Sequence, residues 1–93
     1  MGKFRIEIDK NAQIDFEKIY LSGDKIIIKK VEKMILELSV NPYIGTGHPE
    51  PLKHNLHGYW SRRINKKDRL VYQVIEEPDK YVVIISALGH YFD

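Results

Sequence analysis

A glutamate between two prolines is the most distinctive chemical feature of this sequence. Glu50 lies between Pro49 and Pro51, in a segment that also contains Gly45 and Gly47. Because proline restricts the backbone, the two prolines should hold this carboxylate in a narrow range of positions on a loop. A carboxylate held in this way could act as a general base, although most loop glutamates are simply exposed surface residues.

Histidines are the natural acid partners for such a base, because an imidazole with an ordinary pKa of about 6.5 exchanges protons near neutral pH. His48, His54 and His57 surround the proline-rich loop, and His90 follows the last apolar segment of the chain. Each of them can also be a surface residue without a catalytic role. The sequence therefore offers several candidate acids without selecting one.

Basic residues are concentrated after the proline-rich loop. The net charge is only +2, with 15 basic and 13 acidic residues, so the overall charge says little about nucleic acid. Its distribution says more, because Asp68 is the only acidic residue in the stretch from Lys53 to Arg69. The basic residues of that stretch are Lys53, Arg62, Arg63, Lys66, Lys67 and Arg69. Such a stretch suits a phosphate backbone, although a solvated basic face has the same composition.

These residue types fit the metal-free cleavage of RNA. In that reaction a base takes the proton of the 2′-hydroxyl, which attacks the adjacent phosphate, and an acid protonates the leaving oxygen while cations hold the developing charge. A metal site is the weaker interpretation, because His48-x-Glu50 and His54-x-x-His57 match neither a helical nor a Cys–His metal-binding pattern. The sequence therefore predicts no metal ion and no other cofactor.

Length and composition predict a single domain that spans residues 1–93. A chain of 93 residues with 43% hydrophobic residues can bury one small core. Its longest apolar run, Tyr81 to Leu88, is far shorter than the roughly 20 residues of a membrane-spanning helix. Met1 to Arg5 lacks the apolar core of a signal peptide, and the absence of cysteine fits a reducing compartment. We therefore expect a cytoplasmic protein without a membrane anchor.

The spacing of apolar residues predicts two consecutive helices in the first half of the chain. Asp9 or Asn11 should cap the first helix, and Gly23 should end it. Asp24 should cap the second helix, which should end at Asn41-Pro42. The short break between them predicts an antiparallel pair. The residues expected to face the core are Ala12, Phe16, Ile19 and Tyr20 in the first helix and Ile27, Val31, Met34, Ile35 and Leu38 in the second.

Alternating or β-branched residues predict four strands. They are expected at Phe4–Ile8, Tyr59–Asn65, Arg69–Ile75 and Tyr81–Leu88. No regular structure is expected in the glycine- and proline-rich segment that precedes the second strand. The resulting order, β-α-α-β-β-β, predicts an α+β fold.

The strands on either side of Lys66-Lys67-Asp68 should form a hairpin with two different faces. With a three-residue turn, Asn65 pairs with Arg69 and Arg63 pairs with Val71. The face expected to cover the helices carries Trp60, Ile64, Leu70, Tyr72 and Val74. The opposite face carries Tyr59, Ser61, Arg63, Arg69, Val71 and Gln73. Because it combines arginines with an aromatic residue, this opposite face is the expected platform for phosphate and base.

Four segments of the sequence carry a resemblance to a known family: Gly47–Leu56, Gly58–Ile64, Asp68–Tyr72 and the C-terminal Gly89-His90-Tyr91. They resemble the YoeB (Txe) family, which belongs to the RelE/ParE superfamily of type II toxins. The resemblance implies a RelE-like fold, in which two N-terminal helices pack on a twisted, mainly antiparallel sheet. It also implies a metal-independent, ribosome-dependent endoribonuclease, or mRNA interferase, that cuts messenger RNA in the ribosomal A site and so inhibits translation.

The same resemblance implies roles for individual residues. Glu50 would be the general base, His90 the general acid, and Arg69 would stabilise the phosphate in the transition state. The residues that would contact RNA are Lys53, Arg63 and Tyr91. The implied partners are the 70S ribosome with its messenger RNA and an antitoxin of the YefM (Phd) type. The implied assembly is a homodimer of the toxin or a toxin–antitoxin heterocomplex.

Two other hypotheses fit parts of the sequence. A non-catalytic protein that binds the ribosome or RNA would share the basic surface but would not need Glu50. A decayed toxin kept as the partner of a repressor is a third hypothesis. The presence of Glu50, Lys53, Arg63, Arg69 and His90 together argues against decay, because a decayed site should have lost some of them.

Overall fold

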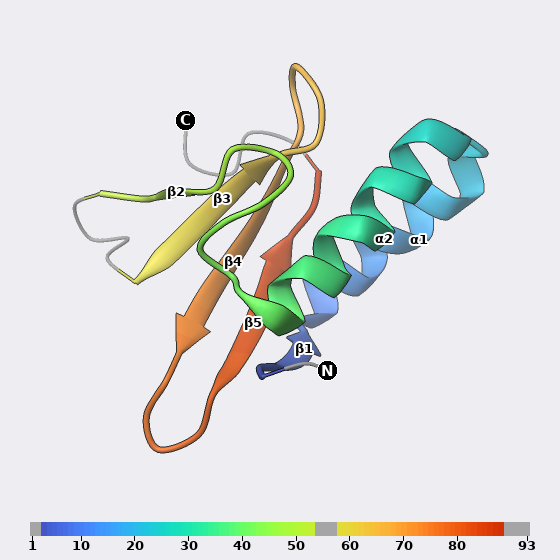
Figure 1. The fold of residues 1–93 in the computed structure, drawn as a ribbon. Coiled ribbons are helices and arrows are strands. Elements are labelled where there is room, and N and C mark those ends of the chain that lie inside the picture. Colours follow the sequence, from blue (N-terminus) through green and yellow to red (C-terminus); the bar gives the residue numbers. More distant parts are fainter. Residues whose placement is uncertain (1–2, 54–57, 89–93) are drawn as a thin grey trace.

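In the described part of the chain, two helices lie on one side of a five-stranded sheet (Figure 1). This computed structural model describes residues 3–53 and 58–88. The elements in chain order are β1 (Arg5–Ile8), α1 (Lys10–Ser22), α2 (Lys25–Val40), β2 (Glu50–Pro51), β3 (Tyr59–Arg63), β4 (Arg69–Ile75) and β5 (Tyr81–Ser86). In the sheet, whose strand order is β1-β5-β4-β3-β2, β1 pairs with β5 in parallel and the other pairs are antiparallel. The expected fold, two helices on a mainly antiparallel sheet, is confirmed.

Strand β2 is an element that the sequence did not predict. Glu50 and Pro51 lie in the segment where no regular structure was expected, yet they pair with Ser61 and Trp60 of β3. An edge strand needs hydrogen bonds on one side only, so it tolerates a proline that a central strand would exclude. The observed order is therefore β-α-α-β-β-β-β, and Glu50 belongs to the sheet rather than to a free loop.

The predicted helix ends are confirmed. Asp9 caps α1 and Asp24 caps α2, each by accepting a backbone N–H with its carboxylate. Gly23 ends α1 in the left-handed region with φ 72°, where glycine is favoured, and Asn41 ends α2. Local signals therefore determine both helices.

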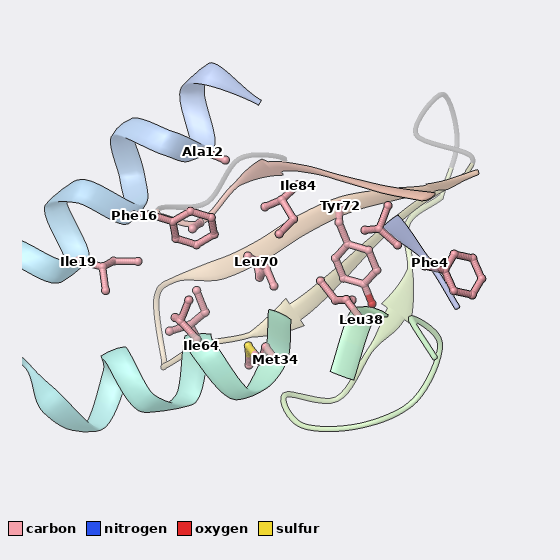
Figure 2. Packing of buried hydrophobic residues seen from close by; sticks show 13 residues of the cluster. Phe4, Ala12, Phe16, Ile19, Met34, Leu38, Ile64, Leu70, Tyr72 and Ile84 are labelled. Carbon is pink, nitrogen blue, oxygen red and sulfur yellow. The ribbon is translucent and has the colours of Figure 1, made fainter. Parts of the chain in front are cut away.

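The core fills the space between the two helices and the inner face of the sheet (Figure 2). Its residues are Phe4, Ala12, Phe16, Ile19, Val31, Met34, Leu38, Ile64, Leu70, Tyr72, Val82, Ile84 and Ala87. The prediction for Tyr20 was wrong, because this side chain is 49% exposed. It lies at the margin of the apolar stripe of α1, and its hydroxyl donates to Glu32 of α2 at 3.3 Å.

The β3–β4 hairpin has a longer connection than predicted. Arg63 pairs with Arg69, so residues 64–68 form the connection, and Ile64 N donates to Asp68 O at 2.9 Å. The predicted three-residue turn is therefore wrong by two positions in register. A shift of two positions leaves every side chain on its predicted face, because side chains alternate along a strand. Leu70 and Tyr72 accordingly lie in the core, as predicted.

Gly47 occupies a position that has no room for a side chain. Its φ is +90°, and a Cβ there would lie 2.5 Å from Met34 Cε and 2.8 Å from the backbone oxygen of Arg63. Gly23 has a similar φ of +72° with nothing within 4 Å of its would-be Cβ. Gly47→Ala should therefore lower the free energy of unfolding by at least about 1 kcal/mol more than Gly23→Ala, because it adds overpacking to backbone strain. Urea denaturation of both variants measures the difference, and equal losses would contradict the crowding at Gly47.

Candidate functional site

The outer face of the sheet, which points away from the helices, brings Glu50 and Arg69 together. Glu50 Oε1 lies 3.4 Å from Arg69 Nη1, although these residues are 19 positions apart and belong to β2 and β4, with β3 between them. The two side chains are 54% and 35% exposed, respectively. A carboxylate and a cation are thus held side by side at a surface that a ligand can reach.

Arg63 adds a second guanidinium group to this part of the sheet. It is exposed, and it pairs directly with Arg69 across β3 and β4. Like charges opposite each other destabilise an antiparallel pair, so two arginines here are better explained by an anionic ligand than by stability. Lys53 is also exposed and follows β2 by two residues.

The exposed platform is narrower than the sequence predicted. Ser61, Val71 and Ser86 are neighbours across β3, β4 and β5 on the outer face, and all three are buried, with at most 3% exposure. Among the described residues, neither serine hydroxyl has a hydrogen-bond partner. Of the six residues predicted for this platform, Ser61 and Val71 are therefore covered, whereas Arg63 is exposed and Tyr59, Arg69 and Gln73 are half-buried.

Two predicted site residues, His90 and Tyr91, lie outside the described residues, as do His54 and His57. Of the candidate acids, only His48 is described; it is exposed and has a φ of 59°. In residues 3–53 and 58–88, no group of three or more histidine, aspartate or glutamate side chains is arranged to hold a metal ion. No helix in the same residues is long and apolar enough to cross a membrane.

Asp15 of α1 holds the segment that follows β5. Its Oδ2 accepts the backbone N–H groups of Ala87 at 2.9 Å and of Leu88 at 3.3 Å. These are the last described residues before the segment that contains His90. No local pattern in the sequence indicates this contact, because it joins a helix carboxylate to a strand end 72 residues away.

Arg62 does not belong to the basic surface in which the sequence analysis placed it. Its side chain is fully buried on the inner face of the sheet, between Trp60 and Ile64 in the strand alternation. The guanidinium contacts Glu37 Oε1 at 2.7 Å, and Nε donates to the Tyr72 hydroxyl at 3.2 Å. The burial of Arg62 could have been predicted from the sequence. Side chains alternate along a strand, so a strand that places Trp60 and Ile64 in the core also places residue 62 there.

Glu37 joins Arg62 to the loop between α2 and β2. Its carboxylate accepts both the backbone N–H and the hydroxyl of Thr46 at 2.8 Å, in addition to the Arg62 guanidinium. Partial burial raises the pKa of this carboxyl, but the hydrogen bonds from Thr46 and the hydrogen bond and charge of Arg62 outweigh that effect. The pKa of Glu37 therefore lies below its ordinary value.

This lowered pKa makes the stability of the protein depend on pH. Ionised Glu37 stabilises the fold above its unfolded-state pKa, about 4.5, and this contribution is lost as the pH falls through the lower folded-state pKa. Glu37→Gln should therefore destabilise the protein at neutral pH, and the difference from wild type should shrink as the pH falls below about 4.5. Urea denaturation at neutral pH and at a pH below about 4.5 measures this difference in stability. The control is Glu17→Gln, at an exposed position on α1. A difference that is constant with pH would contradict the role of the Glu37 charge.

The chain is similar to known toxins along most of its length. The family model described as "YoeB-like toxin of bacterial type II toxin-antitoxin system" matches residues 9–91. The Toxin YoeB of a Synechocystis strain is 44% identical over 72 residues, which are 77% of this chain and 80% of that protein. The family match includes the residues of the outer-face site, Glu50, Arg63 and Arg69.

Solved structures agree with the sequence comparison. The YoeB/ParE toxin from Agrobacterium tumefaciens matches with a TM-score of 0.82 and 31% identity, covering 95% of this chain and all of that one. The YoeB dimer from Staphylococcus aureus matches with a TM-score of 0.78 and 37% identity, and a heterotetrameric YoeB–YefM toxin–antitoxin complex from the same organism with 0.76 and 36%. Each of these two matches covers 97% of this chain and 100% of the other. The chain therefore belongs to the family of YoeB-like toxins of bacterial type II toxin–antitoxin systems.

Proposed function

We propose that this toxin is a metal-independent endoribonuclease that cuts messenger RNA in the ribosomal A site and thereby inhibits translation. The observation that supports the proposal best is the arrangement of Glu50, Arg69 and Arg63 on the exposed end of the outer face. It combines a base with two cations on a surface that is open to a ligand. A nuclease that uses no metal ion needs this combination.

The proposed reaction begins at the 2′-hydroxyl of the RNA. Glu50 takes its proton, and the oxygen attacks the adjacent phosphorus, forming a phosphorane whose charge Arg69 and Arg63 stabilise. The bond to the 5′ oxygen then breaks, and His90 gives that oxygen a proton. The products are a cyclic phosphate and a free 5′-hydroxyl. Lys53 would contribute positive charge, and Tyr91 would position or stack the substrate.

The Glu50–Arg69 ion pair is compatible with this role. It is partly exposed, and ion pairs of this kind contribute little to stability, typically about 0–1 kcal/mol. The substrate phosphate can therefore replace the carboxylate as the partner of Arg69 at a low energetic cost. In the absence of RNA, the same pair holds Glu50 beside the place where phosphate would bind.

The proposed partners are the ribosome with its messenger RNA and an antitoxin of the YefM type, in the cytoplasm. The antitoxin and the self-association are supported by the similar S. aureus proteins, which form a YoeB dimer and a YoeB–YefM complex. A homodimer or a toxin–antitoxin heterocomplex is therefore the expected assembly of this chain.

Mapping the 5′ ends of messenger RNA after induction tests the function. Wild type should create new 5′ ends within translated regions, and Glu50→Gln should not. Growth arrest without new ends would instead support a non-catalytic inhibitor, for which Arg63 and Arg69 alone could provide the binding surface. If wild type and Glu50→Gln both arrest growth and both create the same new 5′ ends of messenger RNA, cleavage does not need this carboxylate.

A further inference from the structure

The loop between α2 and β2 is held from the inside by Arg62. Each nitrogen of the guanidinium donates a hydrogen bond. Nη2 donates to Ile44 O at 2.8 Å, Nη1 donates to Thr46 O at 3.3 Å, and Nε donates to the Tyr72 hydroxyl. Longer contacts reach Pro42 O at 3.4 Å and Asn41 O at 3.5 Å. Carbonyl groups of four loop residues thus converge on one side chain.

Neighbouring side chains close the same loop around Arg62. The Tyr72 hydroxyl donates to Pro42 O at 2.7 Å, and Glu37 binds both Thr46 and Arg62. A Cβ at Gly45 would lie 2.5 Å from Glu37 Oε1 and 3.0 Å from Arg62 Nη1, so the backbone wraps closely around the two charged groups. We call Arg62, Glu37, Thr46 and Tyr72 the Arg62 cluster.

A fully buried guanidinium needs this many partners. Removing a charge from water is costly unless hydrogen bonds and an opposite charge compensate for the loss of hydration. The rigid, planar fork of arginine directs its donors to several acceptors at once, whereas the ammonium of lysine is a compact charge on a flexible stem. Lysine at position 62 would keep the charge but could not satisfy the same set of carbonyls.

The loop held by the Arg62 cluster leads directly to Glu50. At its end, Gly47 O accepts the backbone N–H of Arg63 at 2.6 Å, and three residues later Glu50 pairs with Ser61. The carboxylate itself is 54% exposed, so packing does not hold it in place. Its position beside Arg69 depends on the backbone that carries it, and β2 is only two residues long.

We propose that Arg62 is a positioning residue for Glu50. From the inner face of β3 it fixes the loop that sets the place of the carboxylate on the outer face, while its neighbour Arg63 faces the ligand. This inference rests on the proposed function, in which Glu50 is the general base. It assigns different tasks to two adjacent arginines, one that binds the loop and one that binds phosphate.

The decisive experiment compares Arg62→Lys with a core variant that lowers stability elsewhere. Ile6→Ala suits this purpose, because Ile6 packs against the core from β1, at the opposite edge of the sheet from β2, and truncation of a core isoleucine typically costs about 2–5 kcal/mol. Both variants are assayed as purified full-length protein on programmed ribosomes, at a temperature where each is folded by circular dichroism. The readouts are the cleavage rate at saturating ribosome concentration, the KM, and hydrogen exchange at the Thr46 amide.

Arg62→Lys should lower the saturating cleavage rate about 10–100-fold, because misplacing a reacting group by about 1 Å has effects of this size. Its KM should change by less than about threefold, since the exposed phosphate-facing groups are unchanged. The Thr46 amide should exchange faster than in wild type. Ile6→Ala should keep the wild-type rate and slow exchange at Thr46, although its stability is lower.

Equal cleavage rates for Arg62→Lys and Ile6→Ala would overturn the inference, and so would a loss in Arg62→Lys that lies entirely in KM. Where Arg62→Lys does not fold, Glu37→Gln takes its place, because it keeps the shape of the cluster and removes one charge. A several-fold lower saturating rate is then expected, and a wild-type rate overturns the inference. If the wild-type protein does not cut RNA at all, the proposed function and this inference are both wrong. If wild type and all variants cut RNA at the same rate, only this inference is wrong.

Discussion

Replacing Glu50 with glutamine should lower the rate of messenger RNA cleavage about 10²–10⁴-fold, the usual contribution of a general base. Glutamine has nearly the same shape as glutamate but cannot take the proton of the 2′-hydroxyl. The fold should not change, because the side chain is 54% exposed and its ion pair with Arg69 is partly exposed as well. Single-turnover cleavage on programmed ribosomes measures the effect, and the melting temperature reports on the fold.

The matched control for this variant is Glu17→Gln, an equal change at an exposed position on α1. It should cut at the wild-type rate, which separates the loss of a base from the loss of one negative charge. A purified Glu50→Gln protein that cuts as fast as the control would exclude Glu50 as the base.

Replacing Arg69 with glutamine should lower the cleavage rate about 10²–10³-fold, the range found when one donor that stabilises transition-state charge is removed. Arg69 is the cation that forms an ion pair with Glu50, with Nη1 3.4 Å from the carboxylate, and it pairs with Arg63 across β3 and β4. Arg69→Lys should recover only part of the activity, because lysine keeps the charge but loses the two-pronged geometry. Single-turnover rates of both variants test the prediction.

Arg5→Gln provides the control for Arg69. Arg5 also forms an exposed ion pair, with Glu7 at 2.9 Å, but it lies on β1 at the opposite edge of the sheet. Removal of this arginine changes the net charge by the same amount without touching the site. If Arg5→Gln and Arg69→Gln slowed cleavage equally, the effect of Arg69 would come from the overall charge of the protein and not from a contact with the reacting phosphate.

The two exposed arginines of the hairpin and the buried one illustrate how little residue type alone reveals. Arg62, Arg63 and Arg69 all contributed to the same basic stretch of the sequence, yet Arg62 is desolvated and holds a loop. The difference follows from the alternation of side chains along β3. A count of basic residues in this stretch therefore overestimates the surface that can contact phosphate.

Local chemistry was enough to predict the helices and the composition of the sheet faces. Asp9, Gly23 and Asp24 act within one helical turn of themselves, so their effect can be recognised without any knowledge of the fold. The faces of β3 and β4 also followed from sequence, because alternation survives an error of two positions in register. The family resemblance selected Glu50, Arg63 and Arg69 from among many charged residues.

Only the tertiary structure decided how these residues are held. The Glu50–Arg69 contact joins strands that are not neighbours, and it depends on β2, a two-residue edge strand with no sequence signal of its own. The same is true of Asp15 at the end of β5 and of Arg62 within the loop, because each contact joins segments that are distant in the chain. The sequence by itself therefore determined the helices, the two faces of the hairpin and the chemical groups, whereas the spacing between those groups came from long-range packing, which no local pattern encodes.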